Sequence, residues 1–159
     1  MHKKFVLFCA DALALAASLM LASSTSDAST NNVDLSLTGG TVAGYTAAQP
    51  FQELPVSFTM TNHGSIATSV DFQFTITNAT ASGEDYVCPT VGDGFNINAD
   101  TPFCEPGVLR AHKQTSAAIL VTPSISSGTV IVQACANDEA GHHDPVPGNN
   151  CKSVSIPIR

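Results

Sequence analysis

The chain has 159 residues, a length typical of one domain, and 43% of them are hydrophobic while only 12% are charged. This composition excludes a disordered chain, and the many Thr, Ser and Val residues with scattered Gly and Pro favour short strands joined by turns. The formal net charge of −7, with only 6 Lys and Arg in total, argues against nucleic acid or anionic lipid as a partner, because an acidic surface repels phosphate.

The first residues have the three-part pattern of a secretory signal peptide. A positive start, Lys3-Lys4, precedes an apolar run over 5–21 and then a stretch of small and polar residues. The pattern predicts a signal peptide over 1–28, with cleavage after Ala28 or alternatively nearer Ser23.

A membrane anchor is the alternative interpretation of this apolar run. Asp11 interrupts it, and the uncharged stretch that remains is too short to span a bilayer as a helix. No second apolar stretch follows. We therefore expect an exported domain over 29–159 that does not insert into a membrane after cleavage.

Alternation of apolar and polar residues, the period of a strand with one buried face, recurs along the rest of the chain. Gly39-Gly40 is expected to end the first strand, Asn62-His63-Gly64 to form a turn, and Pro123 to end the fourth strand. The middle segment, 78–107, predicts loops and one or two short strands, with a short apolar piece at Phe95 and Ile97. The six clearer strands are expected at 33–38, 54–62, 70–77, 116–122, 129–135 and 150–158.

The same parity assigns an inward and an outward face to each strand. Asp71 and Gln73 are expected to face outward, and a polar loop is expected over 136–149. About seven short strands without helical periodicity predict an all-β, immunoglobulin-like two-sheet antiparallel sandwich. The expected inward residues are Leu54, Val56, Phe58, Met60, Val70, Phe72, Phe74, Ile76, Val130, Val132, Ala134, Val154, Ile156 and Ile158.

Four cysteines follow the predicted signal peptide, and an even number in an exported chain favours disulfides. Parity places Cys135 and Cys151 on the outward faces of two strands joined by a hairpin loop, where cross-strand neighbours come close enough to bond. The sequence therefore predicts a Cys135–Cys151 disulfide, which leaves Cys88–Cys104 to link the ends of the irregular middle segment.

Several segments resemble the bacterial cell-adhesion-related domain called CARDB and the related repeat domain of bacterial surface proteins. The closing part is the most specific: Ala134-Cys135-Ala136, a loop, and then the segment 144–151 ending in Asn149-Asn150-Cys151. CARDB loops often carry glutamates before the Asn-Asn pair, where this chain has Asp144 and two prolines. The other segments that carry the resemblance are 33–36, 56–64, 107–109 and 116–123.

The resemblance covers nearly all of the exported part of the chain, and it implies an immunoglobulin-like sandwich for adhesion or assembly at the cell surface. CARDB domains often occur in tandem, whereas this sequence has room for one copy and shows no internal repeat. The implied partner is a cell-surface protein or polysaccharide, and the implied location is the periplasm, the cell surface or the medium. A fold resemblance does not name the ligand.

Motifs for chemistry are scarce. No Gly-x-Ser-x-Gly elbow, His-Glu-x-x-His pair, phosphate-binding glycine loop or calcium loop occurs, so we expect no enzymatic activity and no cofactor. A hydrolase remains a distant third hypothesis. Sandwich domains usually bind through loops at one end, and the candidate binding-loop residues here are Asn62, His63, Gly64, Asp138 and Glu139.

The alternative function is that of a small periplasmic metal-binding protein that uses the loop 136–149. Imidazoles and carboxylates together can hold zinc or copper, and His142, His143 and Asp144 are the candidate ligands. A second version adds Cys135 and Cys151 as thiolate ligands. The competing interpretations are a solvated loop tip for the first version, and a disulfide in an oxidising compartment for the second.

Overall fold

The computed structural model describes residues 32–81, 87–88, 95–96 and 102–159. The predicted signal peptide, 1–28, lies outside these residues. Nine strands are described, and all strand pairs are antiparallel. No helix in the described part of the chain is long and apolar enough to cross a membrane.

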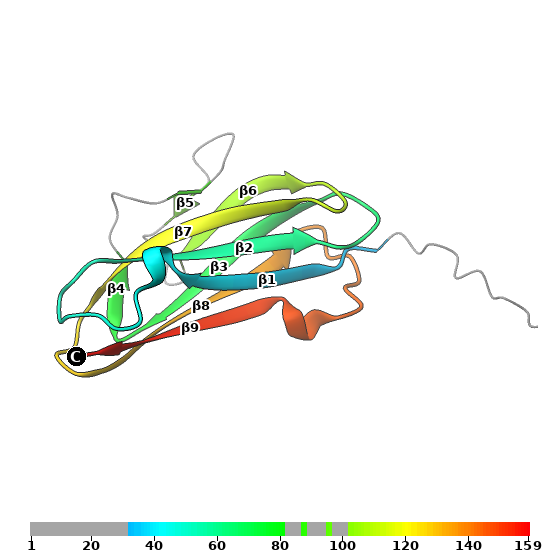
Figure 1. Ribbon diagram of the computed structural model, residues 1–159. Coiled ribbons are helices and arrows are strands. Elements are labelled where there is room, and N and C mark those ends of the chain that lie inside the picture. The colour runs from blue at the N-terminus through cyan, green and yellow to red at the C-terminus, as the bar shows by residue number, and fades with distance from the viewer. Residues whose placement is uncertain (1–31, 82–86, 89–94, 97–101) are drawn as a thin grey trace, which may run out of the picture.

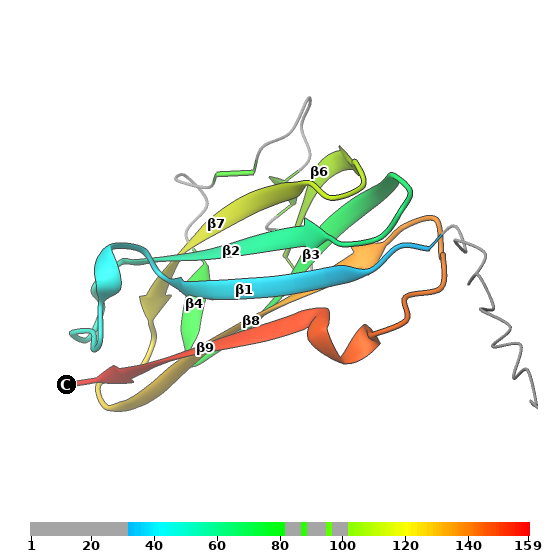
Figure 2. The ribbon, with the colours of Figure 1, turned by 45° about the vertical axis from the view of Figure 1, so that its right-hand side comes forward.

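The strands form two sheets packed face to face, as Figures 1 and 2 show. The first sheet, of four strands, has the order β1-β2-β7-β4 and contains Leu35–Thr41, Leu54–Asn62, Gln114–Pro123 and Ala79–Ala81. The second sheet, of five strands, has the order β5-β6-β3-β8-β9 and contains Phe95–Asn96, Phe103–Leu109, Thr68–Thr77, Gly128–Asp138 and Cys151–Ile158. Two 3₁₀ turns, η1 (Val42–Gly44) and η2 (Pro147–Asn149), precede β2 and β9. The expected all-β sandwich is confirmed.

Strand parity predicts the core correctly. Of the fourteen expected inward residues, only Ile76 and Val154 are half-buried, and the others are buried. The two sheets meet at an aromatic contact, where the rings of Phe58 on β2 and Phe74 on β3 lie 6.0 Å apart with an interplanar angle of 57°. Removing these apolar side chains from water is the main stabilising term, at about 25 cal/mol per Å².

The first strand does not end at Gly39-Gly40 as expected. It continues to Thr41, with Gly39 opposite Phe58 and Gly40 opposite Ser57. A Cβ at Gly39 would lie 2.3 Å from Phe58 Cδ1, so glycine is needed there because the neighbouring ring lies against its backbone. Sequence parity could not distinguish this close approach from a chain break.

The expected loop 136–149 is also shorter than predicted. β8 continues to Asp138, because Ala136, Asn137 and Asp138 pair with β3. The middle segment contributes β4, β5 and the seven-residue β6, which is longer than the short strands expected there. β3 and β7 each begin two residues earlier than predicted, at Thr68 and Gln114. With β4, β5 and β6, the structure has nine described strands where about seven were expected.

Candidate functional site

Three connections meet at one end of the sandwich, which we call the loop end. They are 63–67 between β2 and β3, 110–113 between β6 and β7, and 139–150 between β8 and β9; the C-terminus lies at the opposite end (Figures 1 and 2). Hydrogen bonds join these connections to neighbouring strands. The main-chain N–H of Asn62 donates to Lys113 O at 3.0 Å, and that of Glu139 donates to Ser69 O at 3.1 Å. All the residues that the sequence predicts for binding lie at this end.

Asn62, predicted as a binding-loop residue, holds the loop end together through its side chain. Its side chain is fully buried, and its Oδ1 accepts a hydrogen bond from the N–H of Gly64 at 2.9 Å. Its Nδ2 donates to Ile66 O at 2.8 Å and to Leu109 O at 3.3 Å. Both ends of the amide are therefore used to hold the turn and the β6–β7 hairpin in place.

Gly64 also has a structural role. A Cβ at this position would lie 2.3 Å from Asn32 O and 2.8 Å from Asp34 N, so the turn packs tightly against the chain that leads into β1. His63 is exposed, and its Nε2 lies 2.9 Å from Ser36 Oγ. Of the three predicted turn residues, only His63 presents its side chain to solvent.

Asp138 organises the start of the β8–β9 connection. Its carboxylate accepts hydrogen bonds from the hydroxyl of Thr68, from the N–H of Ala140 at 3.1 Å, and from the N–H of His142. The ring Nδ1 of His142 lies 2.9 Å from Asp138 Oδ2. Burial acts to raise the pKa of Asp138, but these hydrogen bonds to the charged form outweigh it and lower the pKa below the ordinary value. Both carboxylate oxygens are thus occupied within the protein.

Asp144, predicted as a metal ligand, fastens the connection to the first sheet. Its Oδ2 accepts from the N–H of Leu35 at 2.9 Å and from Asn150 Nδ2 at 3.0 Å, and its Oδ1 accepts from the N–H of Val146 at 2.8 Å. His143 is exposed. Within the described ranges, no group of three or more His, Cys, Asp or Glu side chains is placed to hold a metal. The structure therefore does not bring His142, His143 and Asp144 together as a ligand set.

The cysteines are joined in the two predicted pairs, of which strand parity predicts Cys135–Cys151. Cys135 and Cys151, opposite each other on β8 and β9, form a disulfide with a Cα–Cα distance of 4.1 Å. Cys88 and Cys104 form the second, at 5.8 Å. A thiolate site at Cys135 and Cys151 is therefore contradicted, because both sulfurs are bonded to each other.

The sequence prediction missed an acidic hollow on the outer face of the second sheet. Asp71, Gln73, Phe103 and Glu105 line a volume of about 410 Å³. Asp71 is expected to face outward, yet only 8% of its surface is exposed, and its Oδ1 has no hydrogen-bond partner among the described residues. Its Oδ2 accepts from Gln73 Nε2 at 3.2 Å.

The carboxylates of this hollow interact unfavourably. Burial raises the pKa of Asp71, and the charge of Glu105 adds to the effect, while the side-chain amides of Gln73 and Asn137 oppose it. Burial raises the pKa of Glu139 too, followed by repulsion from Glu105 and Asp71. Parity predicts correctly that Asp71 points to the outer face. It could not show that the side chain is buried in the folded protein, beside the bulge that β6 has opposite Asp71.

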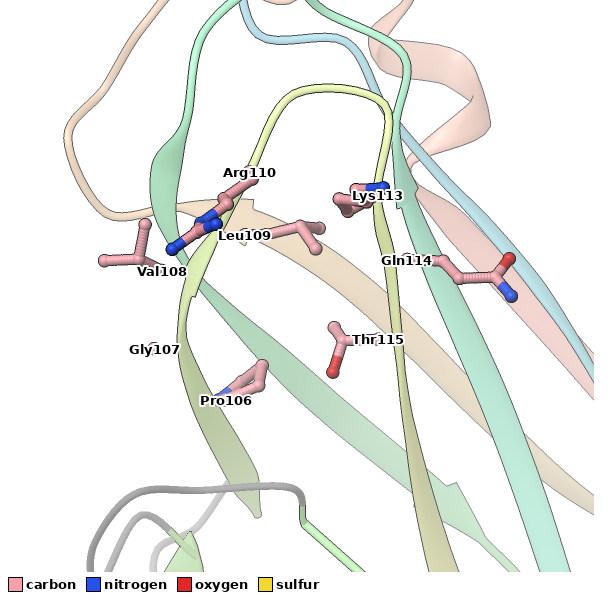
Figure 3. Close-up of a pocket in the computed structure, with 8 residues that line it drawn as sticks. All are labelled: Pro106, Gly107, Val108, Leu109, Arg110, Lys113, Gln114 and Thr115. Atoms are coloured by element: carbon pink, nitrogen blue, oxygen red, sulfur yellow. The ribbon is translucent and has the colours of Figure 1, made fainter.

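A second hollow lies within the β6–β7 hairpin, and Figure 3 shows its lining. It has a volume of about 250 Å³ and is lined by 106–110 and 113–115. Leu109 points between the two strands, while Val108 and Arg110 point to the other side of β6 and Gln114 points away from the hollow (Figure 3). Val108 is 68% exposed although it is apolar. The hairpin thus carries an exposed apolar side chain next to cations in an otherwise acidic protein.

The fold and its loop end define a class, the small antiparallel β-sandwich with a set of connections at one end. No protein-family model matches the sequence, and no curated protein matches it. Solved structures do resemble it. The crystal structure of a CARDB domain from Pyrococcus furiosus, determined in complex with di-metal ions, has a TM-score of 0.55 and 12% identity, over 80% of this chain and 90% of that one.

Two further structures agree with this result. The solution structure of the same Pyrococcus furiosus CARDB domain has a TM-score of 0.53 and 12% identity, over 79% of this chain and 95% of that one. BslA, a bacterial hydrophobin, has a TM-score of 0.50 and 9% identity, over 78% and 95%. The resemblance to CARDB that the sequence suggests is therefore confirmed for the fold. At these identities it shows the fold alone.

Proposed function

We propose that this chain is an exported, non-enzymatic adhesion or interaction module with an immunoglobulin-like sandwich fold. The observation that carries the proposal is the match of nearly the whole domain, and not of one motif, to a CARDB domain. CARDB takes its name from cell adhesion, and a sandwich that presents several connections at one end is a common scaffold for binding. The fold does not name the ligand.

Two observations support a location in the cell envelope or outside the cell. The chain starts with the charged and apolar pattern of a signal peptide. Two disulfides join its four remaining cysteines, and such bonds persist in oxidising compartments. The proposal covers the periplasm, the cell surface and the medium alike.

The proposed binding surface is the loop end, including the hollow of the β6–β7 hairpin. Lys113 and Thr115 supply a cation and a hydroxyl beside the hollow, and Pro106 and Leu109 line it with apolar atoms. Polar hydrogen-bonding groups beside an apolar wall suit both a polysaccharide and a loop of a cell-surface protein. The predicted loop residues Asn62 and Asp138 contribute by holding this surface in shape.

The test is a binding measurement on the exported chain. Purified protein is titrated against cell-surface polysaccharide fractions and immobilised envelope proteins. We expect saturable binding that Lys113→Glu weakens about tenfold and that Arg159→Glu, with the same charge change at the opposite end, leaves unchanged. Absence of binding to every fraction would contradict the adhesion function. Equal effects of the two substitutions would contradict the location at the loop end.

The absence of catalysis is part of the same proposal. Ester, peptide and glycoside substrates should give no turnover above the rate of a heat-denatured sample. A rate that saturates with substrate and disappears in His63→Ala or His142→Ala would replace the adhesion function by a hydrolase.

A further inference from the structure

Strand β6 and Arg110, which directly follows it, carry three kinds of side chain in succession on the outer side of the second sheet. Phe103 lies opposite Gln73 and Val108 opposite Ser69 in the β3–β6 pairing, so each shares the outer face with its partner. Glu105, Val108 and Arg110 are all exposed, whereas Cys104 and Leu109 are buried on the inner face. Read towards the loop end, the order is therefore acid, apolar, base.

The acidic end of this series lacks a counter-charge within the chain. Asp71, Glu105 and Glu139 interact with one another and with neighbouring amides, and in the described part of the chain none of them makes a salt bridge. Asp71 is nine-tenths buried, lines the hollow beside Glu105, and leaves its Oδ1 without a hydrogen-bond partner. Carboxylates that are partly buried and lack a counter-charge favour the binding of a cation from outside the chain.

The basic end of the series, Arg110, lacks a partner of opposite charge within the described part of the chain. Arg110 is exposed and, among the residues that the structure describes, makes no salt bridge. Figure 3 shows its guanidinium on the same side of β6 as Val108, away from the interior. Val108 is 68% exposed and lies between the two charged ends. A guanidinium suits this role because its planar array of donors matches carboxylates and stacks on aromatic rings such as that of Phe103.

We propose that two copies of this chain associate through this face, with Arg110 of each copy in the acidic hollow of the other. A two-fold axis passing near Val108 makes the series self-complementary, because it places acid on base twice and Val108 against its own copy. Measured against the register of β3, Glu105 lies beside Asp71 and Arg110 follows Leu109, which is opposite Thr68, so the midpoint falls near Ser69 and its partner Val108. Each hollow then receives the donors that Asp71 and Glu105 lack.

The association belongs to the weak, charge-dependent class. The face lies on β6 and β3, and the groups that would pair across it are charged, which is typical of small, weak interfaces. Opposite charges in pairs also predict a strong salt effect. This inference does not rest on the adhesion ligand, because Val108 and Arg110 point to the opposite side of β6 from Leu109, which points into the hairpin hollow (Figure 3).

The experiment is sedimentation velocity of the exported chain over a concentration series in low and high salt. We expect a monomer–dimer equilibrium that about 0.5 M salt shifts towards monomer. Arg110→Glu and Glu105→Arg, each alone, should weaken the dimer about tenfold or more, because each places like charges together twice. The control Arg159→Glu should leave the equilibrium unchanged.

Charge exchange gives the decisive result. A mixture of the Arg110→Glu chain with the Glu105→Arg chain should form a heterodimer, since both contacts then join opposite charges. A single chain with both substitutions should form a homodimer again. The proposal is wrong if the unaltered chain stays monomeric at millimolar concentration in low salt, if the mixture stays monomeric, or if the species are open chains larger than a dimer. None of these outcomes depends on whether polysaccharide or envelope protein is bound.

Discussion

The side-chain Nδ2 of Asn62, at the end of β2, donates a hydrogen bond to the main-chain oxygen of Leu109, at the end of β6, over 3.3 Å. β2 belongs to the first sheet and β6 to the second, so this bond joins the two layers at the loop end. The main-chain N–H of Asn62 donates in addition to Lys113 O, on the other side of the same hairpin. One buried amide thus positions the turn 63–67 and the hairpin that carries the proposed binding surface.

Replacement of Asn62 should therefore destabilise the whole loop end. Asn62→Ala removes three side-chain hydrogen bonds and leaves Leu109 O and Ile66 O without that donor in a buried setting, which should cost about 3 kcal/mol. Urea unfolding followed by circular dichroism measures the change. His63→Ala, one residue along and exposed, is the control and should cost less than about 1 kcal/mol. Similar losses for the two variants would contradict the structural role of Asn62.

Two glycines offer a matched test of close packing. Gly64→Ala places a methyl group 2.3 Å from Asn32 O and should lower the free energy of unfolding by several kcal/mol, since backbone must move. Gly40→Ala meets nothing within 4 Å and should change it by less than about 1 kcal/mol. Thermal unfolding of both variants gives the comparison. An unchanged Tm for Gly64→Ala would mean that the turn is not packed against the chain before β1.

Asp144 should matter for stability and not for metal binding. Asp144→Ala removes the acceptor for Leu35 N–H, Val146 N–H and Asn150 Nδ2, and we expect a loss of about 2 kcal/mol. His143→Ala, in the exposed neighbour, should be nearly neutral. Calorimetric titration with zinc and copper should show no difference between these variants and the unaltered chain. A metal affinity that both substitutions abolish would restore the metal-binding interpretation of this loop.

The contribution of Asp71 to the free energy of unfolding should depend on pH with the opposite sign to that of most carboxylates. Because its pKa is raised in the folded state, its contribution to stability is complete below its ordinary value of 3.8 and is lost as the pH rises through the raised value. Asp71→Asn removes this loss, so at pH 7 the variant should be more stable by on the order of 1 kcal/mol.

The gain from Asp71→Asn should disappear at pH 3, where the carboxyl of the unaltered chain is protonated in both the folded and the unfolded state. Urea unfolding at pH 3, 5 and 7 tests the sign. Glu53→Gln, an exposed carboxylate in the β1–β2 connection, serves as the reference. If Asp71→Asn is less stable than the unaltered chain at pH 7 and equally stable at pH 3, the charge of Asp71 is favourable in the fold.

Much of the fold follows from the sequence, because alternation is a local property of the chain. Leu54, Val56, Phe58 and Met60 on one strand and Val130, Val132 and Ala134 on another are buried as their parity predicts. The same local rule places Cys135 opposite Cys151 and so predicts their disulfide. Each of these inferences needs only the two-residue period of a strand and the preference of apolar groups to leave water.

What the tertiary structure alone decided depends on contacts between segments far apart in the sequence. Asn62 and Asp144 look like exposed turn residues, but their partners, Leu109 and Leu35, are 47 and 109 positions away. Asp71 has the outward parity of a solvent-exposed residue, yet only 8% of its surface is exposed in the folded protein, where Phe103 and Glu105 of β6 line the same hollow. A polar side chain is buried where it finds hydrogen-bond partners, and a local sequence pattern does not identify a partner on another strand.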